Sequence, residues 1–285
     1  MGKRYPAVAG YFYPSDKEEL INLIKECFIH KIGPGKLPPK PEFSKALAFI
    51  CPHAGYIYSG PIAAHSYYWA SSIKDVELVV IVGPNHYGIG SGVATFKEGS
   101  WLTPLGEVDI DKDGAKELVK ISGIVDYDEG AHLREHSLEV QLPFLQFIYS
   151  HKFKILPICI NLQDKYTALE LGKALANLLR NYDKKYILIA SSDLTHYEPY
   201  ERAKEKDLKL LEQVLKMDIT SYYTVLERLN VTACGYGAIA TIMEACRELK
   251  ATKVELLKYA NSGDTAGDKS SVVGYPSVMF SFKDE

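Results

Sequence analysis

Residues 78–87 read LVVIVGPNHY, five apolar residues that run directly into a turn-forming segment with a histidine. An apolar run of this length, bounded by Gly and Pro, is typical of a strand that is buried on both faces. The same pattern recurs in three other runs, Ala46–Ile50, Ile155–Ile160 and Tyr186–Ala190. We therefore expect four buried strands that form the centre of a sheet.

Helical patterns separate these runs, and they cover Pro61–Ala70, Lys112–Ile121, Arg134–Tyr149, Thr167–Arg180, Tyr200–Met217 and Tyr236–Lys250. A capping box that begins at Ser15 opens an earlier helix to about His30, and a Pro/Gly-rich loop follows over Lys31–Pro41. The alternation of buried strands and helices predicts an α/β fold, a three-layer sandwich with a largely parallel central sheet. We expect Trp101–Ile110 and Val272–Phe282 to be antiparallel additions, and residues 1–285 to form a single domain.

Composition narrows the possible partners. The 285 residues carry 33 Lys and Arg against 36 Asp and Glu, and this balance argues against a nucleic-acid partner because phosphate binding needs a basic surface. The five cysteines form no Cys-x-x-Cys pair, which excludes zinc ribbons, and their sparse use fits a reducing compartment. The apolar runs are too short to span a bilayer. We expect a soluble, cytoplasmic protein without a membrane partner.

A histidine follows the carboxyl end of three of the four apolar runs, at His53, His86 and His196. Ligands of open α/β sheets bind in the crevice beyond these strand ends, so neighbouring parallel strands would bring the three imidazoles together. Convergent imidazoles are typical of a metal site. A single histidine in a turn is more often a surface or capping residue, but three at equivalent positions favour the metal site. The fourth run ends in residues 161–163 without a histidine, which indicates an outlying strand or one whose end faces elsewhere.

Two acidic residues near histidines each have two interpretations. Asp193 precedes His196 by three residues, where it either caps the following turn or accepts a hydrogen bond from the imidazole and fixes its tautomer. His136 and Glu139 are one helical turn apart and would share a helix face. They belong either to an exposed acidic helix N-terminus or to a proton-transfer pair beside the crevice. The sequence leaves both alternatives open.

Cys234 stands directly before the helical pattern that begins at Tyr236. A helix N-terminus lowers the pKa of a thiol, which makes Cys234 a candidate thiolate ligand or nucleophile. A small buried hydrophobe is the alternative, and it is the usual environment of a free cysteine. Among the remaining histidines, His65 and His151 are expected to be structural or solvated.

Five motifs together resemble the Memo family, and they are Pro52–Tyr56, Gly83–His86, Glu135–Glu139, Ser191–His196 and Cys234-Gly235. The resemblance extends from Ala7 to Tyr275, and the order and spacing of the motifs are specific to it. The family is similar in fold to the class III extradiol ring-cleaving dioxygenases, which are non-haem iron enzymes. The resemblance therefore implies a dioxygenase-like fold.

The resemblance also implies roles for particular side chains. The metal position would be lined by His53, His86 and Cys234. His196 would stand where the dioxygenases keep an acid–base histidine, with Asp193 behind it.

The walls of the pocket are expected to be aromatic. By the resemblance, the family's peptide-contacting aromatic positions fall on Phe12 and Tyr58. We expect Tyr56 to shape the same pocket, because tyrosine offers a flat, rigid body with a polar tip.

The expected metal follows from the donor set. The dioxygenases hold Fe(II) with two histidines and a carboxylate, whereas here Cys234 takes the place of the carboxylate. A thiolate is a softer ligand that favours Cu(I) or Zn as well as iron. We expect one first-row transition metal, Fe(II) or Cu foremost and Zn as the alternative.

The leading functional hypothesis is a metal-dependent oxidoreductase that acts on a small molecule. The alternative is a non-catalytic adaptor module that binds a peptide or phosphopeptide in the same crevice, and a metal-dependent hydrolase is a third. In prokaryotes the family also resembles one part of a gene grouping with a radical-SAM protein, which implies a partner from that system.

Overall fold

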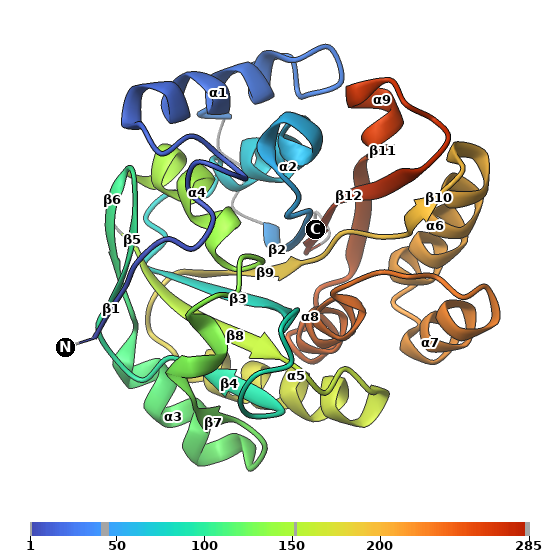
Figure 1. The fold of residues 1–285 in the computed structure, drawn as a ribbon. Coiled ribbons are helices and arrows are strands. Elements are labelled where there is room, and N and C mark those ends of the chain that lie inside the picture. The colour runs from blue at the N-terminus through green and yellow to red at the C-terminus, as the bar shows by residue number, and fades with distance from the viewer. Residues whose placement is uncertain (1, 41–45, 151–152, 283–285) are drawn as a thin grey trace.

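A mixed β-sheet with a parallel centre organises the chain (Figure 1). The computed structural model describes residues 2–40, 46–150 and 153–282, so Pro41 and His151 lie outside the described residues. The centre consists of β2 (Ala46–Cys51), β9 (Tyr186–Ser191), β3 (Leu78–Pro84) and β8 (Lys154–Ile160), which lie side by side in that order and are parallel. These strands contain the four apolar runs, so the α/β prediction with a parallel centre is confirmed.

Antiparallel strands extend the sheet on both sides. On one side β12 (Val272–Ser281) pairs with β2, and β11 (Lys253–Asn261) and β10 (His196–Glu198) pair with β12. On the other side β4 (Val93–Thr95) pairs with β8, and β7 (Asp126–Tyr127) pairs with β4. The expected antiparallel addition at Val272–Phe282 is therefore part of the central sheet.

The expected addition at Trp101–Ile110 is antiparallel but lies apart from the central sheet. There β5 (Ser100–Thr103) and β6 (Gly106–Asp109) form a hairpin, which joins β1 (Lys3–Arg4) in a separate small sheet. Trp101 is fully buried in this sheet, and the Arg4 guanidinium lies 4.3 Å from the centre of its ring. The hairpin is therefore anchored by its pairing with β1, and a single bridge between Ile110 and Ile155 links its end to β8 of the central sheet.

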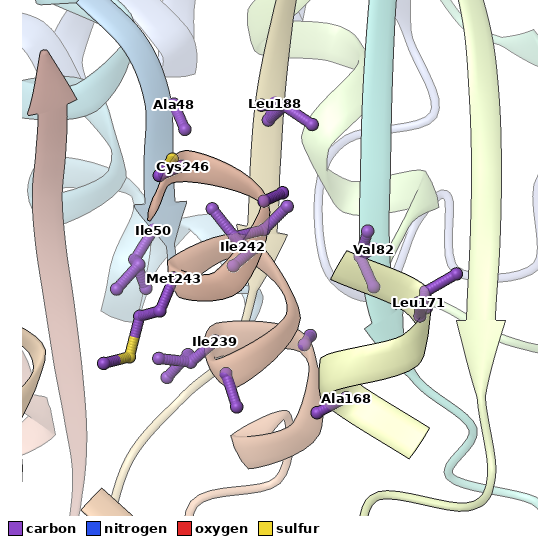
Figure 2. Close-up of a cluster of buried hydrophobic side chains, with 14 of the residues drawn as sticks. Ala48, Ile50, Val82, Ala168, Leu171, Leu188, Ile239, Ile242, Met243 and Cys246 are labelled. Carbon is purple, nitrogen blue, oxygen red and sulfur yellow. The ribbon is translucent and has the colours of Figure 1, made fainter. Parts of the chain in front are cut away.

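Helices cover both faces of the central sheet. On one face lie α5 (Lys165–Arg180) and α8 (Tyr236–Glu248), where Ile239, Ile242 and Met243 of α8 pack towards Ile50 and Leu188 (Figure 2). On the other face lie α1 (Lys17–Ile29), α2 (Tyr56–Ala70) and α4 (Leu142–Tyr149). Successive strand residues point to opposite faces, so each strand contributes to both cores.

The remaining helices are α3 (Lys112–Ser122), α6 (Tyr200–Leu215), α7 (Ile219–Arg228), α9 (Ser262–Ala266), and the 3-10 helices η1 (Glu129–His132) and η2 (Glu139–Gln141). Among the described residues, no helix combines the length and the apolar character needed to cross a bilayer.

The predicted helix over Arg134–Tyr149 is wrong in its first half. The α-helix begins only at Leu142, because residues 139–141 form a 3-10 turn and the Glu135 carboxylate accepts the backbone N–H of Ser137. Pro143 lacks a backbone N–H and is tolerated only in the first turn of a helix, which fixes the start there. His136 and Glu139 therefore share no regular helix face.

Two other helix starts differ from the prediction. The side chain that caps α1 is that of Asp16 rather than Ser15, and it accepts hydrogen bonds from the backbone N–H groups of Glu18 and Glu19. Helix α2 begins at Tyr56, five residues before the predicted start, and carries Pro61 inside it.

Candidate metal centre

A cavity of about 640 Å³ opens at the carboxyl ends of the central strands. Its lining includes His53 after β2, His86 after β3 and His196 at β10, which begins just beyond β9. Parallel neighbours β2, β9 and β3 end at the same edge of the sheet, which brings these distant segments together. Strand β8 also ends there, and its neighbour β4 occupies the outer side.

Three potential ligand atoms meet in this cavity. One atom each from His53, His86 and Cys234 lies within 4.8 Å of the others, and His53 Nε2 is 3.1 Å from Cys234 Sγ. The imidazole of His53 is buried, while that of His86 is partly exposed to the cavity. Two imidazole nitrogens and one sulfur form a donor set that suits Zn, Cu and iron, so these residues fit a transition metal.

The outer nitrogen of His86 is held by a buried carboxylate. Glu135 Oε1 lies 2.9 Å from His86 Nδ1, and Oε2 accepts the backbone N–H of His86 at 2.6 Å. Burial alone would raise the pKa of Glu135, but hydrogen bonds from the imidazole of His86 and the backbone of Ser137 hold it at about 2. The ionised carboxylate accepts a hydrogen bond from a protonated Nδ1. The other ring nitrogen, His86 Nε2, therefore keeps a free lone pair. This is the carboxylate–histidine pairing that orients metal ligands.

The hydrogen bonds of Asp193 go to the backbone of His53 rather than to the imidazole of His196. Its Oδ1 accepts the backbone N–H of His53 at 2.8 Å, and its own backbone N–H points to Cys234 Sγ at 3.3 Å. Burial raises the pKa of Asp193 to about 6. Asp193 thus fixes the backbone around two candidate ligands.

Burial, followed by the neighbouring carboxylate of Asp193, raises the pKa of the Cys234 thiol. A helix N-terminus alone favours a lower thiol pKa, but desolvation has the larger effect here. The expected lowering of this pKa is therefore not found in the metal-free protein.

His196 is oriented by backbone carbonyl groups. Its Nδ1 lies 2.7 Å from Leu194 O and 3.0 Å from Thr232 O, and carbonyl oxygens only accept. Nδ1 therefore carries the proton, and Nε2 is free to accept one. The backbone N–H of His196 donates to Thr232 Oγ1 at 2.8 Å, which fixes the start of β10.

His136 also lines the cavity, stacked on His86 with ring centroids 4.5 Å apart. Burial lowers its pKa to about 4, so the ring is neutral at pH 7. The ring of Phe12 also packs against His136, with ring centroids 4.7 Å apart, and lines the cavity.

Three other predicted site residues lie elsewhere. Tyr56 is buried and its hydroxyl donates to Val140 O, while Tyr58 is 41% exposed and absent from the cavity lining. Glu139 points away from the crevice and forms a buried ion pair with Arg4 at 2.7 Å.

Four residues that contribute to the site were given no role from the sequence, and they are Glu135, Gln141, Ser191 and Tyr197. Glu135 and Ser191 begin two of the five motifs. Glu135 was detectable as an acid beside a motif histidine. A buried serine and glutamine have no comparable sequence signature, because both residue types are mostly exposed and their burial depends on the tertiary fold.

The sequence profile of the Memo-like protein family matches residues 4–279. The chain belongs to the Memo family. It is 47% identical to a MEMO1 family protein of Methanopyrus kandleri over 279 residues, covering 98% of this chain and 99% of that protein. A MEMO1 family protein of Methanocaldococcus jannaschii is 48% identical over 282 residues, covering 97% and 98%. The motif histidines and Cys234 of this Memo-family chain therefore lie within residues 4–279, the part of the chain that matches the family profile.

Among solved structures, an uncharacterized protein of Escherichia coli K12 is similar in fold. Its TM-score is 0.55 at 14% sequence identity, and the match covers 82% of this chain and 99% of that one. At this identity the likeness concerns the fold of the Memo-family chain alone.

Proposed function

We propose that this protein is a metal-dependent oxidoreductase that acts on a small molecule, with iron or copper bound by His53, His86 and Cys234. The observation that carries the proposal is the meeting of two imidazole nitrogens and one sulfur within 4.8 Å, beside a cavity of about 640 Å³. A solvent-accessible cavity beside three protein ligands leaves room for substrate, as catalytic metal sites require. The dioxygenase-like fold remains part of the same proposal.

The protein side chains have distinct tasks in this proposal. A bound iron or copper ion would supply the redox chemistry. His196 Nε2 accepts a proton from the substrate, because its Nδ1 is already committed to two carbonyl oxygens. The rings of neutral His136 and Phe12 pack together in the cavity wall and exclude water from that side of the reacting groups.

The charge of the lining supports a substrate without a phosphate group. Among the described residues that line the cavity, none is Lys or Arg. Phosphate recognition relies on such cations, so the lining favours a small uncharged molecule over a phosphopeptide.

An unphosphorylated peptide is the second candidate ligand, which the protein would bind as an adaptor. Tyr197 in the cavity lining is 78% exposed, and Tyr11, which precedes the lining residue Phe12 in sequence, is 88% exposed. Exposed tyrosines of this kind are common in protein-binding surfaces.

Metal content tests the ligand set directly. The protein reconstituted anaerobically with Fe(II) or Cu(I) is expected to retain about one metal per chain by mass spectrometry. His86→Ala is expected to lose it, while His30→Ala, which changes a histidine outside the cavity lining, retains it. Equal metal content in both variants would refute the ligand assignment.

Turnover then separates the two candidates. The oxidoreductase proposal predicts oxygen consumption by the metal-loaded protein with aromatic or other small reductants, and none by His196→Ala. Peptide affinity without turnover across several metals and reductants would favour the adaptor.

A further inference from the structure

The two ring nitrogens of His53 face different surroundings. Nε2 points to Cys234 Sγ at 3.1 Å, whereas Nδ1 lies 2.9 Å from Ser191 Oγ. Only an unprotonated Nε2 can bind a metal, so the function of the ring depends on which nitrogen carries the proton. The hydrogen-bond partners of Ser191 decide this.

Ser191 has one hydroxyl hydrogen and two other partners besides His53. Ser137 O lies 2.6 Å from its Oγ and can only accept, so the hydroxyl hydrogen goes there. Gln141 Nε2 lies 2.7 Å away and can only donate. Ser191 Oγ therefore has no hydrogen left for His53, and Nδ1 must donate to it.

The amide of Gln141 is oriented just as firmly. Its Nε2 also donates to Pro52 O at 3.1 Å, a carbonyl that can only accept. Its Oε1 accepts the hydroxyl of Tyr67. Both amide hydrogens and the amide oxygen thus have partners, and a flipped amide would face a carbonyl oxygen with its own oxygen.

This chain of hydrogen bonds joins distant parts of the sequence. Ser191 ends β9, Gln141 ends η2, Tyr67 lies on α2 and Pro52 follows β2. The side chains of Ser191, Gln141 and Tyr67 are at most 1% exposed, so water does not compete for their hydrogen bonds. The donor and acceptor of each bond follow from two backbone carbonyl groups that can only accept, Ser137 O beside Ser191 and Pro52 O beside Gln141.

We propose that Ser191 and Gln141 are positioning residues that hold His53 in the Nδ1–H tautomer, which presents a bare Nε2 to the crevice. His86 reaches the same state through the carboxylate of Glu135, whereas His53 is held by a neutral hydroxyl and amide. The tautomer is a property of the metal-free protein. Its consequence for metal binding rests on the proposed function.

Histidine-selective 15N correlation spectra of the metal-free protein test the tautomer, since they distinguish a protonated ring nitrogen from a bare one. The His53 signals are identified by their absence in His53→Gln. The wild type is expected to show a protonated Nδ1 and a bare Nε2. A protonated Nε2 in the wild type would overturn the proposal.

Ser191→Ala removes the acceptor, so its His53 is expected to populate the Nε2–H tautomer, and Ser191→Thr, which retains the hydroxyl, restores the wild-type spectrum. Ser66→Ala is the matched control, because Ser66 is also buried and donates to Ile50 O without touching His53. An unchanged His53 spectrum in Ser191→Ala, or the same change in Ser66→Ala, contradicts the assignment.

Gln141→Met provides a second route should Ser191→Ala fail to fold. It removes the donor that helps to fix the Ser191 hydroxyl, which can then turn its hydrogen from Ser137 O towards His53 Nδ1. Exchange between the two His53 tautomers is therefore expected, and a single wild-type tautomer would count against the role of Gln141.

Zinc titration against a chelating dye separates this inference from the proposed function. Ser191→Ala is expected to lose about 10- to 100-fold in affinity relative to wild type. If wild-type protein binds no zinc, iron or copper, the proposed function fails while the tautomer assignment stands. If zinc binds but affinity is equal in Ser191→Ala, the positioning role fails.

Discussion

The buried ion pair between Arg4 and Glu139 offers a decisive stability test through Glu139→Gln. Glu139 Oε2 accepts from Ala7 N at 2.7 Å and pairs with Arg4, while Oε1 accepts from Val8 N at 3.1 Å and Tyr13 at 2.5 Å. Glutamine would place an amide nitrogen, itself a donor, at one of these two oxygen positions, where it would face the N–H and O–H donors that now bind the carboxylate. The substitution also leaves the Arg4 charge buried without a counter-charge.

Removing one partner of a buried ion pair costs about 3–5 kcal/mol, and both side chains here are fully buried. Urea unfolding should therefore report a loss of about 3–5 kcal/mol for Glu139→Gln. Glu107→Gln is the control, since its ion pair with Lys3 is largely exposed and should leave stability almost unchanged.

A double variant checks the cause. Arg4→Met combined with Glu139→Gln should lose less stability than the sum of the two single variants, because neither charge is then left alone. Additive losses, or a loss below about 1 kcal/mol for Glu139→Gln, would refute the ion-pair reasoning.

Three further predictions concern the crevice and its support. Glu135→Gln should lower zinc affinity about 10- to 100-fold, measured by titration, because the neutral amide oxygen accepts the Nδ1–H of His86 more weakly than the carboxylate does; equal affinity would contradict this. Burial raises the pKa of Asp207 to about 6 from its ordinary 3.8, so folding favours its protonated form and this stabilisation is lost as pH rises through 6. Urea unfolding at pH 4.5 and pH 7 should show wild type gaining stability over Asp207→Asn at the lower pH, and parallel behaviour would disprove it. Gly235→Ala places a methyl group 2.4 Å from Ser191 O, which should destabilise the protein by about 1–3 kcal/mol, and a wild-type melting temperature would rule this out.

The sheet was predictable because its strands are uniformly apolar. A run such as Leu78–Val82 has no polar face, so it fits only a strand covered on both sides, and its carboxyl end locates the crevice. His53, His86 and His196 could be assigned to one cavity from this pattern alone.

Side-chain direction beyond the strand ends was not predictable. Tyr56 and Tyr58 lie two residues apart on α2, and such positions point to different sides of a helix, so one is buried and the other exposed. The early start of this helix was hidden by Pro61, which the sequence suggested as a first residue.

The supporting contacts of the site depend on long-range geometry. Asp193 is close to His196 in sequence but binds the backbone of His53, 140 residues away. Glu139 resembled a partner of His136, yet the early turns at residues 134–141 direct it to Arg4. Local spacing gives no information on either choice.

The anchoring of Arg4 by Glu139 has a consequence for how the protein is synthesised. Ala7 and Val8, in the segment that leads to Phe12, are synthesised more than 130 residues before Glu139, which accepts hydrogen bonds from their backbone N–H groups. Cys234 and Val273 of the cavity wall follow later still, and β12, which pairs with β2, is the last strand in the order of elements. The cavity lining is thus complete only after residue 273 has been synthesised, and a nascent chain stalled before residue 272 would expose the unpaired edge of β2 to other chains.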